Sequence, residues 1–384
     1  MAHITEFEVQ GLVGRSDGYS RRLNRDVNVF FGVNGSGKTS LLKILHGAMA
    51  NEIRSLAAVP FASARVCIYS NDYQQEFEYT YDKRTDPLPS KADIPNVAAE
   101  WAVAVTRFQL PSPDPGWTIS PPRPKDAAGR WAHRYLPTSR LFGRTDATWR
   151  ARDAYDVTAS EEALESVLAE LLGHLWASYS AEVLGNAKRV QEDGLNRILR
   201  SVLSKRPERV ARVIDADEAY RRATIFLGGT AVRLLGTQSD FRQRFTSDTH
   251  MQNVIAHISE IQERVEQMTI PRTRLQLLIR EMFSGPKEVR FSDNGIEIRA
   301  PGEKSIPLAS LSSGEKQLLR ILLEALTAEK NSIIVDEPEI SMHVEWQRRL
   351  LNAMQTLNSG CQIVVATHSP EIMADVDDDK IFRL

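Results

Sequence analysis

The sequence predicts an α/β fold in which helices flank a mixed or parallel sheet, with an antiparallel β layer and a helical insertion. Three observations predict it. Residues 32–39 match the phosphate-binding pattern GxxxxGK[ST], between a strand-like apolar run and a helical pattern. Residues 332–337 and 363–368 are two further apolar runs, and each ends in polar or charged residues. Ligand-binding residues at the carboxyl ends of buried strands are typical of open α/β sheets.

The N-terminal part predicts a β layer beside this sheet. Residues 3–9, 75–81 and 101–108 alternate between apolar and polar side chains, as half-buried strands do. Residues 111–124 are dense in proline and predict a loop without regular structure. We expect residues 1–150 to form one lobe that carries the β layer and the phosphate-binding loop.

The middle of the chain predicts a helical insertion over residues 151–284. Apolar residues recur at helical spacing over residues 163–176, 254–265 and 273–282. No stretch sustains the uninterrupted heptads of a long coiled coil, and glycines and Pro271 interrupt the pattern. The sequence therefore predicts a compact helical insertion, not a chromosome-condensation arm.

A last lobe is expected over residues 285–384. Residues 288–291 and 296–299 read as a hairpin with an Asn-Gly turn. Residues 311–317, Leu-Ser-Ser-Gly-Glu-Lys-Gln, then open an amphipathic helix that should run from about residue 315 to 329. A helix beginning there offers backbone N–H groups and a positive dipole end to an anion.

The residue types of the phosphate-binding loop suit a nucleotide. Glycines let the backbone fold back, so that successive N–H groups point inward at phosphate oxygens. Lys38 would reach the β- and γ-phosphates of ATP, and Thr39 would offer its hydroxyl to Mg²⁺. The predicted nucleotide contacts of this loop are Asn34, Gly35, Ser36, Gly37, Lys38, Thr39 and Ser40.

The two later apolar runs end in residues suited to hydrolysis. Asp336 is expected at the carboxyl edge of the sheet, where its hard oxygen ligands would hold Mg²⁺ together with Thr39. Glu337 is placed to orient and deprotonate the attacking water. His368 would donate a hydrogen bond to the γ-phosphate and so report its presence. The predicted catalytic residues are Glu337 and His368, and the predicted metal ligands are Thr39 and Asp336.

The order of these segments resembles the ABC-type ATPases. In that resemblance residues 32–39 are Walker A, residues 311–317 are the signature, and Asp336 and Glu337 are Walker B with the catalytic glutamate. His368 then corresponds to the switch histidine.

The signature segment is the part of this resemblance that implies a partner. By resemblance, Ser312, Ser313 and Gly314 contact the γ-phosphate that another protomer binds. ATP would then join two heads in a head-to-tail sandwich, and hydrolysis would release them. This chain departs from the LSGGQ or LSGGE form, because Ser313 replaces the first glycine and Glu315 takes the last place.

Within the ABC-type ATPases the chain resembles the OLD-like (overcoming lysogenization defect) group. Residues 336–343, followed by Trp346-Gln347, resemble the DEPE-x-x-LH-x-x-WQ run of that group, with Val344 where proline is usual. Residues 135–140, Tyr-Leu-Pro-Thr-Ser-Arg, resemble the (F/Y)-x-P-x-x-R segment that these ATPases carry where transporters have a Q-loop. Whether the arginine of that segment, Arg140, reaches the nucleotide or stays on the surface is left open.

The resemblance implies an ATPase that uses ATP and Mg²⁺ and works as a homo-oligomer, a sandwich dimer or a larger assembly. Nuclease-less ATPases of this group, such as those of the Septu and PARIS systems, serve in bacterial antiphage defence beside a separately encoded effector. We therefore expect a separate effector protein such as a nuclease. No TOPRIM-type nuclease domain precedes Leu384, so the chain is expected to be no nuclease itself.

Two other functions remain open. A RecF-like DNA-repair clamp would bind DNA junctions directly, and an ATP-locked structural scaffold would use slow hydrolysis only as a timer. A neighbouring nuclease gene favours defence, and neighbouring recombination genes favour repair. Tight ATP binding with almost no phosphate release favours the scaffold.

Charge and composition limit the partners. The formal net charge of −2 gives no global basic footprint, so any contact with nucleic acid must be local. Arginine clusters such as residues 206–212, 221–222, 242–244 and 272–274 suit phosphate, but acids and hydrophobics are interleaved with most of them, as on solvated helix faces.

Cysteine usage and hydropathy suggest the compartment. Cys67 and Cys361 are the only cysteines, and both read as reduced interior thiols with no metal-ligand spacing. No secretory signal and no apolar run of about 18 residues is present, so we expect no membrane span and a cytoplasmic location.

Overall fold

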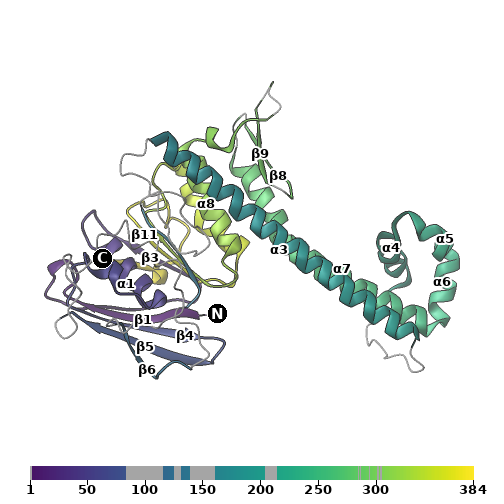
Figure 1. Ribbon diagram of the computed structural model, residues 1–384, viewed down its shortest axis with the longest axis horizontal. Coiled ribbons are helices and arrows are strands. Elements are labelled where there is room, and N and C mark those ends of the chain that lie inside the picture. Colours follow the sequence, from purple (N-terminus) through teal and green to yellow (C-terminus); the bar gives the residue numbers. More distant parts are fainter. Residues whose placement is uncertain are drawn as a thin grey trace, which may run out of the picture. The chain divides into compact units, whose positions relative to one another are not determined.

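The structure is a computed structural model that describes residues 2–83, 116–124, 131–138, 161–203, 214–283, 285, 287–293, 295–300, 302 and 305–384 (Figure 1). It contains two compact units. The first comprises Met1–Leu175, Leu278–Arg290 and Ile296–Leu384, and the second comprises Trp176–Leu277 and Phe291–Gly295. The domain limits drawn from the sequence at residues 150 and 284 stay a prediction.

The first unit is built on a parallel sheet with the strand order β12-β3-β11-β10-β7. Strands β10 and β11 are buried along their whole length, which is why their sequences are apolar without alternation. Asp336 at the end of β10 pairs in register with Ala366 of β11, so the polar residues that follow both strands emerge at one edge. The strands are β3 (Val27–Phe31), β7 (His133–Leu136), β10 (Ser332–Asp336), β11 (Ile363–Thr367) and β12 (Ile381–Arg383).

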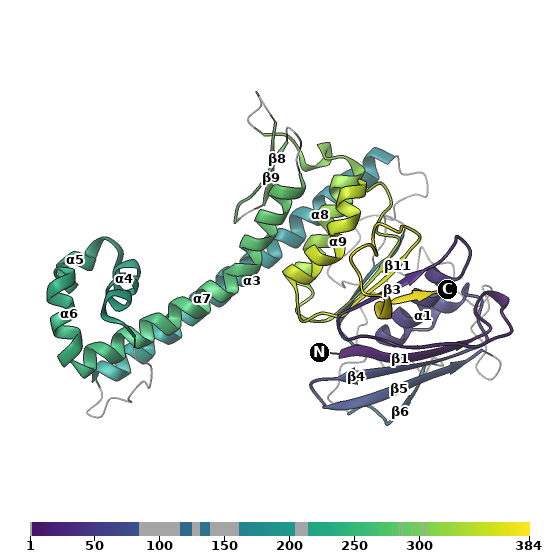
Figure 2. The ribbon, with the colours of Figure 1, turned by 180° about the vertical axis from the view of Figure 1, so that it is seen from behind.

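An antiparallel sheet forms a second layer, in the order β2-β1-β4-β5-β6. Helix α1 (Lys38–Ala50) lies between the two sheets (Figures 1 and 2). Its Leu41 and Leu45 share one core with Phe7 and Phe77 of the antiparallel sheet and Ile334 of the parallel sheet. The strands are β1 (Ala2–Gln10), β2 (Tyr19–Arg22), β4 (Ser63–Ser70), β5 (Gln75–Asp82) and β6 (Thr118–Ser120).

These two sheets confirm the predicted α/β fold and its antiparallel layer. Residues 3–9 and 75–81 lie in β1 and β5, whereas residues 101–108 lie outside the described part of the chain. The proline-dense segment 111–124 contains β6, a short strand that the sequence did not predict. An edge strand of this length needs few ladder hydrogen bonds, so nearby prolines do not prevent it.

Helices α8 (Ser313–Thr327) and α9 (Val344–Leu357) complete the first unit and pack against each other. The predicted helix from residue 315 begins two residues earlier, because Ser312 caps it. Short 3-10 turns are Leu12–Gly14, Arg54–Leu56, Leu308–Ser310 and Asp378–Lys380 in this unit, and Gly228–Thr230 in the other.

The middle of the chain is helical as expected, and two of its helices extend well beyond the apolar stretches of residues 163–176, 254–265 and 273–282. Helix α3 runs over Glu161–Leu203 and α7 over Thr249–Met282, and α7 continues through Pro271. Within the second unit they run antiparallel, so that Gly194 faces Ile261. Mutual packing therefore supports both helices where the sequence lacks heptads. Shorter helices α4 (Ala216–Leu227), α5 (Ala231–Leu235) and α6 (Gln238–Ser247) lie between them in the chain.

Most of the described arginines in the predicted basic clusters are paired with acids. Arg222 contacts Glu218 and Glu263 at 2.6 and 2.8 Å, and Arg242 contacts Asp217. These pairs lower the positive charge that is free to meet phosphate. Residues 206–212 lie outside the described residues.

Three smaller predictions can be compared with the structure. The hairpin forms as β8 (Glu288–Phe291) and β9 (Ile296–Arg299), although Asn294 of its turn is outside the described residues. Cys67 and Cys361 are both free and buried. None of the described helices is both long enough and apolar enough to cross a membrane.

Candidate nucleotide-binding and hydrolysis site

The loop between β3 and α1 has the backbone that its glycines allow. Gly37 has φ +103°, and a Cβ atom there would lie 2.7 Å from the Val13 side chain. A larger residue would be strained by both its backbone angle and its neighbour. Gly37 therefore gives the loop a backbone conformation that a larger residue could not adopt, directly before the start of α1 at Lys38.

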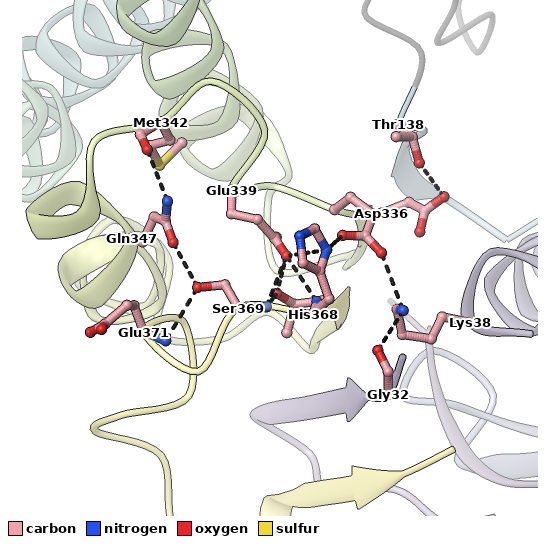
Figure 3. Close-up of polar contacts among 12 residues, drawn as sticks. Gly32, Lys38, Thr138, Asp336, Glu339, Met342, Gln347, His368, Ser369 and Glu371 are labelled. Carbon is pink, nitrogen blue, oxygen red and sulfur yellow. Dashed lines mark hydrogen bonds and ion pairs between the residues drawn. The ribbon is translucent and has the colours of Figure 1, made fainter. Parts of the chain in front are cut away.

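Lys38 is buried under this loop. Its ammonium donates to the carbonyl oxygens of Gly32 at 2.8 Å and Val33 at 3.3 Å, and it lies 3.4 Å from a carboxylate oxygen of Glu337 (Figure 3). Only 4% of the side chain is exposed. Carbonyls and one carboxylate thus hold the cation where a phosphate would replace them.

Asp336 is held by two hydroxyl groups from distant parts of the chain. Thr39 donates to its Oδ1 at 3.2 Å, and Thr138, directly after β7, donates to its Oδ2 at 2.6 Å. Burial raises the pKa of Asp336, and the two hydroxyl donors oppose that rise. The carboxylate and the Thr39 hydroxyl are adjacent hard oxygen donors, which fits Mg²⁺.

Thr138 is a residue that sequence reasoning missed. Thr138 belongs to the segment 135–140 that resembles the (F/Y)-x-P-x-x-R pattern, but it occupies a variable position of that pattern. Its place follows from the parallel pairing of β7 with β10. Ser139 and Arg140 lie outside the described residues.

Glu337 and His368 meet at the edge of the parallel sheet. His368 Nδ1 is hydrogen-bonded to Glu337 Oε2, and the two residues follow adjacent strands β10 and β11. Glu337 has φ +50°, and its N–H donates to the Ala366 carbonyl at 2.8 Å, which fixes this uncommon backbone. Burial raises the pKa of Glu337, and the nearby negative charge of Glu339 adds to the rise.

Glu339 is the second residue that sequence reasoning passed over. One of its oxygens accepts from the backbone N–H groups of His368 at 2.9 Å and Ser369 at 3.1 Å, and from the Thr367 hydroxyl (Figure 3). With Glu337 and His368 it offers ligand atoms within 4.8 Å of one another, a grouping that could also hold a metal ion. The quoted DEPE pattern contained Glu339 but gave it no role.

The Trp346-Gln347 pair supports the same turn from α9. Gln347 Oε1 accepts from the Ser369 hydroxyl at 2.7 Å, and its amide donates to the Met342 carbonyl at 2.8 Å (Figure 3). Trp346 donates to the carbonyl of Met282, the last residue of α7, at 2.8 Å. Gln347 thereby links the turn after His368 to α9, and Trp346 links α9 to the end of α7.

The signature residues form the start of α8. Ser312 accepts from the Glu315 N–H at 3.2 Å, while Glu315 accepts from the Ser312 N–H at 2.6 Å, a capping box. Gly314 is buried because the Ser341 carbonyl occupies the place of a side chain. No hydrogen bond or ion pair recorded among the described residues joins Ser312, Ser313 or Gly314 to the phosphate-binding loop of the same chain.

A protein-family model described as "AAA domain, putative AbiEii toxin, Type IV TA system" matches residues 70–374. The chain belongs to this AAA-domain family. The matched range contains the signature helix, Asp336, Glu337 and His368, and the phosphate-binding loop precedes it. No curated protein matches the chain.

Solved structures with a resemblance include SMC head domains. The Smc head of Pyrococcus furiosus, with an extended coiled coil and bound to the C-terminal domain of ScpA, is 14% identical over 97% of this chain and 92% of that chain, with a TM-score of 0.39. The SMC head of Thermotoga maritima is 12% identical over 98% and 92%, with a TM-score of 0.42.

The family and the α/β architecture agree on the class of domain. The chain contains an AAA-family ATPase domain with a P-loop, and membership of this family suggests ATP hydrolysis.

Proposed function

We propose that this protein binds and hydrolyses ATP and that ATP engages it head to tail with a second copy. One observation carries the proposal. Lys38, Thr39, Asp336, Glu337 and His368 come from three separate parts of the sequence and meet at the carboxyl edge of one parallel sheet. Ligands bind at this edge in open α/β sheets.

The residues divide the work of hydrolysis between them. The backbone of Asn34, Gly35, Ser36 and Gly37, with Lys38, Thr39 and Ser40, receives the phosphates. Thr39 and Asp336 hold Mg²⁺, which supplies positive charge to the phosphate oxygens when it is bound.

Two movements at the site follow from the contacts of Lys38 and Glu337. Lys38 exchanges the carbonyls of Gly32 and Val33 for phosphate oxygens. Glu337 takes the proton of the attacking water after leaving His368, and its raised pKa makes it a better proton acceptor. His368 then donates to the γ-phosphate.

Head-to-tail engagement is supported by the start of α8. Ser312 is exposed, and its N-terminal helix end suits an anion. Since nothing recorded in the described part of the same chain joins Ser312, Ser313 and Gly314 to the phosphate-binding loop, we propose that they complete the site of another protomer. The assembly is a sandwich dimer or a larger homo-oligomer.

The biological role we propose is control of a separate effector protein, a nuclease, in bacterial antiphage defence. It is supported by the OLD-like pattern of residues 336–347 and by a family description that names a toxin of a toxin–antitoxin system. Direct binding of nucleic acid by the second unit is less favoured, because Arg272 stacks on Trp176 and pairs with Asp293 at 2.7 Å. Charge reversal of Arg272 would therefore disturb packing and would not report a phosphate contact.

Two variants test the ATPase proposal. Lys38→Ala should abolish ATP binding, because it removes the main phosphate counter-charge, whereas Glu337→Gln should retain ATP but stall turnover. Filter binding measures the ATP affinity of each variant, and phosphate release measures its turnover. Equal ATP affinity in Lys38→Ala and the native protein would refute the site.

The effector proposal has its own test. The purified chain should cleave no DNA or RNA, and a nuclease encoded beside it should co-purify with it. Metal-dependent cleavage by the pure chain that a substitution outside the ATPase motifs abolishes would contradict the proposal.

A further inference from the structure

Glu339 is a buried carboxylate whose bonds go to one short turn. Its relative exposure is 6%, and it lies on the loop after β10, two residues beyond Glu337. Its Oε1 accepts from three consecutive residues, the Thr367 hydroxyl and the N–H groups of His368 and Ser369 (Figure 3). An ionised acceptor bound to several N–H groups is a strong anchor.

Stability does not explain this carboxylate. A buried charge is costly unless it is paired. Among the described residues, the one ion pair recorded for Glu339 is with His368, at 3.2 Å from Nδ1. Its other oxygen, Oε2, is buried and has no hydrogen-bond partner among the residues described. Such a group requires a specific explanation, and the contacts of its other oxygen supply one.

The bonds of Glu339 set the geometry of the hydrolysis residues. His368 Nδ1 contacts Glu337 Oε2 and lies beside Glu339 Oε1, so two carboxylates face one ring nitrogen. These contacts fix the orientation of the ring, as a carboxylate does for ligand histidines. The backbone bonds at the same time fix the turn that carries the ring.

The hydroxyl of Ser369 fixes the far end of the turn and makes no recorded contact with the His368 ring. The Ser369 hydroxyl donates to Gln347 and accepts from the Glu371 N–H at 3.2 Å. The Glu371 side chain pairs with Arg348 and touches neither Glu337 nor His368 in any recorded contact. Glu371 is therefore a matched acidic control on the same loop.

We propose that Glu339 is a positioning residue for ATP hydrolysis, which holds the turn of residues 367–369 and thereby sets His368 against Glu337. This inference rests on the proposed ATPase function. The contacts of Glu339 go to His368 and the turn that carries it, and its charge also lies near Glu337. Nucleotide binding at Lys38 and Thr39 should not depend on Glu339.

The first test compares Glu339→Ala, Glu339→Gln and Glu371→Gln in steady-state ATP hydrolysis. Loss of geometry at a reacting centre costs up to about 10²-fold. We expect kcat to fall about 100-fold in Glu339→Ala and about tenfold in Glu339→Gln, whose amide oxygen still accepts the N–H groups. KM and the affinity for a fluorescent ATP analogue should stay within about twofold, since the phosphate-binding loop is untouched. Glu371→Gln should behave as the native protein.

Several outcomes would overturn the inference. The inference would be overturned if Glu339→Gln and Glu339→Ala both kept the kcat of the native protein. It would also be overturned if these variants raised KM and left kcat unchanged. If the alanine variant does not fold, the near-isosteric glutamine variant decides alone. A drop in kcat as large in Glu371→Gln would show a general effect of charge on the loop.

A second readout separates this inference from the ATPase proposal. The ¹⁵N chemical shifts of the His368 ring, assigned with His368→Gln, report its tautomer without any turnover. A change of tautomer population in Glu339→Gln supports the positioning role even if the native protein hydrolyses no ATP. Unchanged ring shifts together with native kcat would refute it.

Discussion

The close approach of Gly314 to Ser341 predicts a sharp effect of one methyl group. In Gly314→Ala the new Cβ would lie 2.1 Å from the Ser341 carbonyl oxygen and 3.1 Å from its carbon. The Ser341 backbone, at φ +62°, cannot yield easily. Alanine gains at most about 1 kcal/mol in a helix, whereas overpacking against backbone costs about 1–3 kcal/mol. We expect a net loss of stability of up to about 2 kcal/mol and a displaced start of α8.

Gly173 supplies the matched control for this substitution. It lies inside α3, also in the first unit, and a Cβ atom there would meet nothing within 4 Å. Gly173→Ala should therefore raise stability by up to about 1 kcal/mol. Urea unfolding of both variants gives the two free energies, and sedimentation with ATP shows whether association is lost in Gly314→Ala alone. Equal stability of the two variants would refute the reasoning from the Ser341 contact.

Three further predictions concern the proposed dimer interface, the buried His46 and the two buried cysteines. Ser312→Arg in a Glu337→Gln background should still bind ATP but form less ATP-dependent dimer, because a bulky cation enters the interface. Sedimentation measures the dimer fraction, and an unchanged fraction would count against a role of Ser312 in the site of another protomer. Burial lowers the pKa of His46 from 6.5 to about 3, so the stability that is present above pH 6.5 is lost as the pH falls. The free energy of unfolding should therefore fall by about 1.4 kcal/mol per pH unit between these values in the native protein, and this part of the fall should be absent in His46→Gln. Urea titrations that give the same pH dependence for both proteins would contradict this. Burial raises the pKa of Cys67 to about 11 and that of Cys361 to about 12. Iodoacetamide at pH 8 should therefore label neither thiol in the native protein and both thiols in urea. Rapid labelling of the native protein would refute the burial of these thiols.

The edge of the parallel sheet could be predicted because local patterns determine it. An apolar run that ends in Asp336-Glu337 and another that ends in His368 place those residues at strand ends, and parallel pairing brings the ends together. That geometry requires no knowledge of the intervening chain. The roles assigned to these residues stay predictions until turnover is measured.

Thr138 and Glu339 could not be predicted because their partners lie far away in the sequence. Thr138 reaches Asp336 across 198 residues, and Glu339 meets the turn after β11. A threonine or glutamate alone carries no sign of such a contact. The lengths of α3 and α7 were missed for a similar reason, since each helix is supported by packing such as Ile261 against Gly194.

The strand order of the parallel sheet has a consequence for how the protein is made. Strand β3, which leads into the phosphate-binding loop, lies between β11 and β12, two strands that are synthesised more than 300 residues after it. Gln362 also bonds both backbone groups of Ile4, at 2.9 and 2.7 Å, across 358 residues. Pairings of such long range form late and slowly. A nascent chain therefore cannot complete the parallel sheet on both sides of β3 before synthesis has passed Arg383.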